Sequence, residues 1–138
     1  MSLPLLERST YYRGLLVLIG KDRIVDPRER ELMIRIGGLL DFDTRFCEAA
    51  IESLLNNPHL TAEPMTFSLR RTVECFLRDG LRVALCDGEI HAREQAWLKT
   101  VAEANGLPGE WLDAEIQQIL KDDDTLDRSS PLAIQQHL

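Results

Sequence analysis

Four acidic residues in this sequence form two pairs with the same spacing. Asp22 is followed by Glu29, and Asp87 is followed by Glu94, in each case seven residues later. Carboxylate oxygens are hard ligands of the kind that divalent cations such as calcium and magnesium bind. Paired carboxylates can also do acid–base chemistry. Which of these roles is open to them depends on the elements that hold the pairs in place.

The second pair lies in a stretch with a known counterpart. From Asp87 to Glu94 the sequence runs Asp-Gly-x-Ile-x-x-x-Glu, which is the second half of an EF-hand calcium loop, where the last Glu is a bidentate ligand. The first half is missing, because Val83 and Leu85 stand where that loop needs oxygen ligands. A complete EF-hand is therefore excluded. An ion here would need further ligands, for example from the first pair.

Neighbouring residues modify this hypothesis. His91 is a further candidate ligand, and its imidazole would shift the preference from calcium toward zinc or another transition metal. Arg28 and Arg93 each precede a Glu of the pairs, and a guanidinium beside a carboxylate competes with a bound cation. Arg23 stands where the second pair has Gly88, so the second pair is the better candidate.

Each candidate ligand also has a purely structural interpretation. Glu29 and Glu94 are placed to occupy the third position of a helix, where a carboxylate accepts free backbone N–H groups and interacts favourably with the helix dipole. Asp22 and Asp87 could be ordinary turn residues, and His91 could be an exposed N-cap. Both interpretations stay open at this point.

Apolar residues recur at the i, i+3, i+4, i+7 spacing of helices that pack on a core. The stripes are Tyr12, Leu15, Leu16 and Ile19; Leu32, Met33, Ile36, Leu39 and Leu40; Phe46, Ala50, Ile51, Leu54 and Leu55; Val73, Phe76, Leu77, Leu81 and Ala84; Trp97, Leu98, Val101 and Ala102; and Trp111, Leu112, Ile116, Ile119 and Leu120. The pattern predicts an all-α protein, a compact bundle of six to seven helices.

The chain also matches itself at an offset of 65 residues, where Asp22 aligns with Asp87 and Arg28-Glu29 with Arg93-Glu94. We therefore expect a single domain over residues 1–138, built from two pseudo-symmetric three-helix units at about 10–55 and 70–120. A linker over 56–65 and a tail over 121–138 complete the chain. Ser130 to Ile134 in the tail could start a short helix that docks on the core.

The second acidic elbow, Ala84-Leu85-Cys86-Asp87-Gly88-Glu89-Ile90-His91-Ala92-Arg93-Glu94, is followed by a helix, Gly-Leu-Pro and another helix. This order resembles the TerB-like family of bacterial helical proteins, named for a tellurite-resistance protein. The resemblance implies internal pseudo-two-fold symmetry, a stress-response setting and divalent metal bound at the acidic elbows. By position, Asp87 and Glu94 would be the ligands, and Asp22 and Glu29 are the corresponding residues of the first repeat.

The composition excludes several classes of protein. Twenty-three Asp and Glu against sixteen Lys and Arg give a formal net charge of −7, whereas nucleic acids and anionic membranes attract basic surfaces. We therefore expect no nucleic-acid partner and no direct membrane insertion. No signal peptide is recognised, which favours a cytoplasmic protein. Three cysteines without a CxxC spacing, namely Cys47, Cys75 and Cys86, indicate buried thiols rather than a zinc site.

Two functional hypotheses follow. The first is a TerB-like stress-response module that binds one divalent ion through Asp87 and Glu94, with Asp22, Glu29 and His91 as further candidates, and that uses no organic cofactor. The alternative is a metal-free helical adaptor, a monomer or weak dimer, that docks a protein partner through an acidic face. No motif of a nucleophilic, phosphate-binding or metal-dependent enzyme is present in the sequence, so we expect no enzymatic activity.

Overall fold

The computed structural model describes residues 3–21, 25–56, 64–86, 88–121 and 131–137, and these form a compact all-α bundle without strands. The helices are α1 (Leu5–Ile19), α2 (Pro27–Leu39), α3 (Thr44–Asn56), α4 (Arg70–Ala84), α5 (Ala92–Ala104), α6 (Gly109–Lys121) and α7 (Ala133–His137). The predicted fold class is confirmed. The first helix begins at Leu5, earlier than expected.

The helix boundaries recur along the chain. The bounds of α1, α2 and α3 reappear 65 residues later as those of α4, α5 and α6, with the same lengths of 15, 13 and 13 residues. The offset that aligned the two halves of the sequence therefore also aligns their helices. The pseudo-symmetric arrangement of the two units in space stays a prediction.

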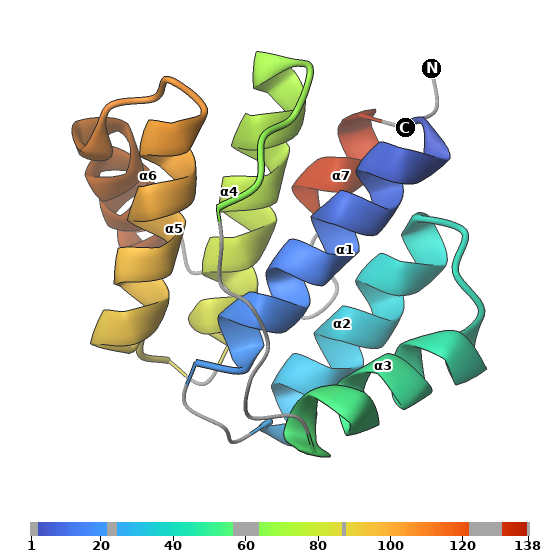
Figure 1. Cartoon of the computed structure of the whole chain (residues 1–138). Helices are drawn as coiled ribbons and strands as arrows, with labels where there is room; N and C mark the ends of the chain where they lie inside the picture. The colour runs from blue at the N-terminus through green and yellow to red at the C-terminus, as the bar shows by residue number, and fades with distance from the viewer. Residues whose placement is uncertain (1–2, 22–24, 57–63, 87, 122–130, 138) are drawn as a thin grey trace.

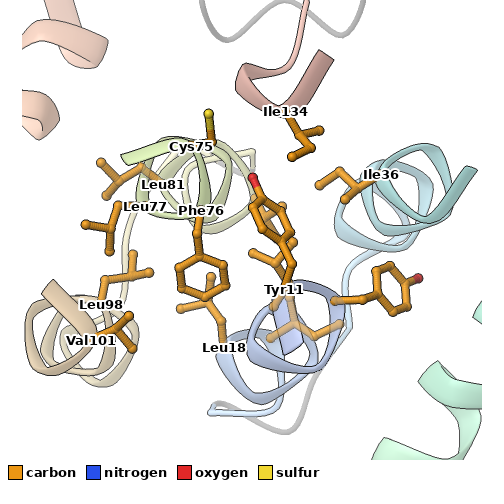
Figure 2. Close-up of a cluster of buried hydrophobic side chains, with 14 of the residues drawn as sticks. Tyr11, Leu18, Ile36, Cys75, Phe76, Leu77, Leu81, Leu98, Val101 and Ile134 are labelled. Carbon is orange, nitrogen blue, oxygen red and sulfur yellow. The ribbon is translucent and has the colours of Figure 1, made fainter. Parts of the chain in front are cut away.

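The first helix of each set lies at the centre of the bundle. α1 packs against α4, while α2 and α3 flank α1 and α5 and α6 flank α4 (Figure 1). Contacts also cross between the two sets, because α1 touches α5 and α2 touches α4. Apolar side chains of α1 and α4, including Leu18, Phe76 and Leu81, are completely buried in the core between them (Figure 2).

Two residues predicted to face the core are largely exposed. Phe46 on α3 is 54% exposed and Leu120 on α6 is 49% exposed. Both helices are peripheral, and the main helix contacts of each are with the other helices of its own set. On α3 and α6 the buried face is therefore narrower than the apolar stripe predicted from the sequence, and it leaves Phe46 and Leu120 outside the core. Among the cysteines, Cys47 and Cys75 are buried as expected, but Cys86 is only partly buried.

The predicted docking of the tail is confirmed. Leu132 and Ile134 are completely buried, and the short helix α7 packs against α4 and α2. In Figure 1 this helix lies close to α4. In the described ranges, no helix combines the length and the hydropathy needed to span a bilayer.

Candidate functional site

The structure describes three of the five predicted site residues. Asp22 and Asp87 lie outside the described residues, as does Arg23. Glu29, His91 and Glu94 lie at the starts of α2 and α5, one element of each repeat. The question for these three is what their side chains contact.

Glu29 completes a capping box at the start of α2. Its side chain is buried and its Oε1 accepts the backbone N–H of Asp26 at 3.1 Å. The Asp26 carboxylate accepts the N–H of Arg28 at 2.8 Å, and Pro27 occupies the first helical position. This arrangement follows from the local sequence, because an Asp cap, a Pro and a Glu three residues later together satisfy free donors at a helix start.

Glu94 occupies the same place at the start of α5. It is 1% exposed, and its Oε1 accepts the backbone N–H of His91 at 3.2 Å. His91 is the N-cap residue and is exposed. The two glutamates therefore have the capping role that the structural interpretation assigned to them, and burial holds each carboxylate against its own helix.

Two basic side chains line a pocket beside the second elbow, among the residues that the structure describes. This surface pocket of about 330 Å³ is lined by Lys21, which follows the end of α1, and by Arg93, Trp97 and Thr100 from α5. Lys21 Nζ lies 5.1 Å from the centre of the Trp97 ring, a cation–π contact. Burial, and then the charge of Arg93, lower the pKa of Lys21. Two like charges at this pocket would repel an incoming cation.

The described residues do not assemble a metal site by themselves. Over the ranges that the structure covers, no group of three His, Cys, Asp or Glu side chains is close enough to share an ion. Arg28 pairs with Asp26 rather than with the adjacent Glu29, at 3.1 Å. Metal binding through Asp22 and Asp87 stays a prediction.

The polar residues that are buried in the second half of the bundle were not among the predicted site residues. Asp79 on α4 is completely inaccessible, and Arg82, one turn later, is also buried. Asp79 accepts a hydrogen bond from the Tyr11 hydroxyl at 2.6 Å. Its other partners are the first two backbone N–H groups of α7, of Ala133 at 2.7 Å and of Ile134 at 3.1 Å.

Burial also changes the acidity of this group, and raises the pKa of Asp79 to about 6 despite these hydrogen bonds and the nearby Arg82. The sequence did contain a sign of this site. Asp79 lies beside the apolar stripe of α4, three residues after Phe76 and four before Val83, and its partner at the 65-residue offset is Gly14. A charged residue beside such a stripe is rarely left without partners when it is buried.

The chain was compared with protein-family models, with curated proteins and with solved structures, and none of the three comparisons gave a match. The TerB-like resemblance therefore rests on the elbow motif and stays a prediction.

Proposed function

We propose that this chain is a small, non-catalytic helical adaptor that docks a protein partner through an acidic face, without a bound metal. The observation that supports this choice is the state of Glu29 and Glu94. Both carboxylates are buried and accept backbone N–H groups at their own helix starts. The pocket beside the second elbow carries Lys21 and Arg93. This chemistry favours helix capping over cation binding.

The best candidate for the acidic face lies on and around α3. Residues 41–56 contain four acidic side chains against one arginine, and all five are exposed; they are Asp41, Asp43, Arg45, Glu48 and Glu52. Asp41 pairs with Arg8 at 3.4 Å and Glu52 with Arg30 at 3.6 Å, so the acidic face is centred on Asp43 and Glu48. Phe46 projects from the same helix with 54% of its surface exposed, and its ring lies 5.3 Å from that of Phe42. An exposed aromatic ring beside carboxylates suits a partner segment with basic side chains around an apolar anchor.

A matched pair of variants tests this proposal. Phe46→Ser removes the aromatic anchor from α3, and Leu120→Ser removes a similarly exposed apolar side chain from α6. A partner captured with the wild-type protein would be purified and titrated by calorimetry against all three proteins. We expect Phe46→Ser to weaken binding at least tenfold, Leu120→Ser to leave it unchanged, and added salt to weaken the wild-type complex. Equal affinity of all three proteins would reject α3 as the docking face.

Cation binding at the elbows is the second candidate. It is favoured by the recurrence of one spacing, since Asp22–Glu29 and Asp87–Glu94 place an Asp and a Glu seven residues apart at the same point of both halves of the sequence. The TerB-like resemblance would place such a module in a cytoplasmic bacterial stress response such as tellurite resistance. Under this hypothesis Asp22 and Asp87 complete the ligand set, and His91 adds an imidazole for zinc.

Titration calorimetry with calcium, magnesium and zinc separates the two candidates. The variant Asp87→Asn removes a proposed ligand, while Glu94→Gln keeps an oxygen that can cap α5 but removes its charge. Saturable binding that both substitutions abolish would establish the metal site and reject a metal-free adaptor. The absence of saturable heat for any of the three ions in the wild-type protein would reject the cation hypothesis.

A further inference from the structure

The segment 131–136, which contains most of α7, packs against α4 and α2, and we call the surface of α4 that it covers the groove. Leu132 and Ile134 provide its apolar anchors, and both are completely buried. A helix of five residues is far too short to be stable alone in water. The groove therefore holds α7 in its helical conformation.

Most polar contacts in this groove are made to the main chain of the segment. The Asp79 carboxylate accepts the N–H groups of Ala133 and Ile134, and Arg82 Nη1 donates to the Pro131 carbonyl at 2.7 Å. Further contacts come from Arg71, which donates to the Gln136 carbonyl at 2.8 Å, and from the Cys75 thiol, which lies 3.6 Å from the Ala133 carbonyl.

These four groove residues share one face of α4, because positions 71, 75, 79 and 82 follow helical spacing. Main-chain groups are common to all peptides, so this face can bind the backbone of any segment that enters with the same geometry. Selectivity then comes from the two apolar positions that Leu132 and Ile134 occupy, one and three residues after Pro131. The groove thus has the two components of a peptide-binding site, backbone hydrogen bonds and side-chain pockets.

The polar face is specific to α4. At the 65-residue offset, Gly14 corresponds to Asp79 and Val17 corresponds to Arg82. Gly14 packs tightly, since an added Cβ would lie 2.6 Å from Met65 Cε and 2.8 Å from the Phe76 ring. The central helix α1 therefore packs in the core without charged residues at the positions where α4 has Asp79 and Arg82. Burying a carboxylate and a guanidinium is unfavourable unless both are well paired, and in α4 the pairing partners include the α7 segment.

The groove continues beyond α7. A cavity of about 230 Å³ adjoins Asp79 and Arg82, with Ala133 and Pro131 on one side and Ile119 of α6 on the other. It is open enough to take a side chain larger than the methyl group of Ala133. The native segment therefore does not fill all of the available space.

We propose that this groove is a peptide-docking surface that α7 occupies in cis, and that a segment of a partner protein displaces α7 from it. The partner segment would carry a proline followed by apolar residues at the first and third positions after it, and would begin a helix there with two free N–H groups. A larger apolar side chain at the intervening position would enter the adjoining cavity. α7 would then act as an autoinhibitory segment. This inference is independent of the acidic face on α3.

The test uses the full-length chain and an acetylated synthetic peptide with the sequence of residues 129–138 as the probe. Ile134→Asp in the protein weakens the cis segment, and Ile134→Ala is a milder second variant. The first readout is the alkylation rate of Cys75, which lies beneath Ala133, measured by peptide mass spectrometry. Cys47, buried beside Gly37 of α2, reports on the integrity of the rest of the fold. The second readout is the affinity for the labelled peptide by fluorescence anisotropy.

We expect Ile134→Asp to raise Cys75 alkylation at least tenfold while Cys47 stays protected, and the peptide to restore protection. The variant should bind the peptide at least tenfold more tightly than the wild-type protein, where α7 competes at high effective concentration. A peptide with Asp in place of Ile134 should not bind, and adding Asp79→Asn to the protein should abolish protection. A peptide with Leu at position 133 should bind more tightly.

Three results would overturn the proposal. One is a Cys75 that stays exposed in a folded Ile134→Asp or Ile134→Ala protein at saturating peptide concentrations. Another is equal peptide affinity of the wild-type and variant proteins, which would place the peptide elsewhere. The third is a concentration-dependent dimer in which two copies of the chain exchange their α7 segments and so bury Cys75. The groove would then bind a second copy of this chain and not a partner protein. Phe46→Ser leaves every expected result unchanged, so failure here is distinguishable from failure of the acidic-face proposal.

Discussion

The Tyr11 hydroxyl donates a 2.6 Å hydrogen bond to the Asp79 carboxylate in the interior of the bundle, across 68 residues of sequence. The bond joins the two central helices, α1 and α4. Figure 2 shows the Tyr11 ring beside Phe76 and opposite Ile36, and the Tyr11 and Phe76 rings meet edge to face at 5.4 Å. Burial, reinforced by Asp79, raises the pKa of Tyr11 well above its usual value, so this hydroxyl keeps its proton and stays a donor at neutral pH.

Removing this donor should destabilise the protein. Tyr11→Phe leaves the buried carboxylate with one hydrogen bond fewer, and hydrogen bonds to charged groups contribute about 1.5–3 kcal/mol. We expect a loss of that size in the free energy of unfolding at pH 8, measured by urea denaturation. The loss should shrink near pH 4, because the protonated carboxyl group depends less on the donor.

Tyr12→Phe is the matched control for this variant. Tyr12 is the next residue on α1, is also buried, and donates to the neutral carbonyl of Met33 at 3.0 Å. Its loss should reduce the stability by only about 0.5–1.5 kcal/mol, with no change between pH 4 and pH 8. Similar losses and pH profiles for the two variants would contradict a special role for the Tyr11–Asp79 bond.

Asp79 should make the stability of the fold depend on pH. Burial raises its pKa to about 6 in the folded protein, above its ordinary value of 3.8. Between these values the folded state binds the proton more tightly, so this group favours folding as the pH falls from 7 to 4 and opposes it as the pH rises. Tyr11 from α1, Arg82 and Cys75 from α4, and the N–H groups of α7 face the carboxylate and modulate this effect.

The measurement is the difference in unfolding free energy between the wild-type protein and Asp79→Asn at several pH values. Other carboxylates titrate in both proteins and cancel. We expect the wild-type protein to gain about 2–3 kcal/mol relative to the variant between pH 7 and pH 4, the amount that a shift of about two pKa units represents. A flat difference would show that Asp79 titrates normally.

Two adjacent glycines on α2 should respond in opposite ways to alanine. A Cβ at Gly37 would clash with the Cys47 sulfur, and would lie 3.2 Å from the Tyr12 ring. Gly37→Ala should therefore destabilise by about 1–3 kcal/mol through overpacking. At Gly38 a Cβ meets nothing within 4 Å, so Gly38→Ala should stabilise by about 0.5–1 kcal/mol, because glycine loses more backbone entropy in a helix. Thermal unfolding of both variants checks the signs, and equal shifts would contradict the close α2–α3 packing.

The role of Glu94 as a cap can be separated from the effect of its charge. Glu94→Ala removes the acceptor for the His91 N–H and should destabilise by about 0.5–2 kcal/mol. Glu94→Gln keeps an acceptor oxygen and should lose only about 0.3–1 kcal/mol, the contribution of a charge near a helix start. Urea denaturation without divalent ions measures both. Equal losses would mean that the hydrogen bond contributes little and the charge dominates.

Features with a local physical cause could be predicted from the sequence. Helical periodicity repeats within one or two turns, and the capping boxes of Glu29 and Glu94 span four residues, so the fold class and the starts of α2 and α5 follow from short stretches of chain. The offset of 65 residues anticipated the recurring helix bounds for the same reason. The apolar pattern wrongly placed Phe46 in the core. Periodicity identifies which residues of a helix are apolar, but it does not show how much of that face the neighbouring helices cover.

Features that depend on contacts between distant segments could not be predicted. Lys21 meets Trp97 only because the end of α1 lies against α5, which changes the charge of the surface beside the second elbow. Asp79 is buried because Tyr11 arrives from one end of the chain and Ala133 from the other. The sequence by itself therefore determined the helices, the capped starts of α2 and α5, and the repetition, since these rest on local hydrogen bonds and periodicity. Only the tertiary structure decided which polar groups are buried together, because burial depends on how all the helices pack.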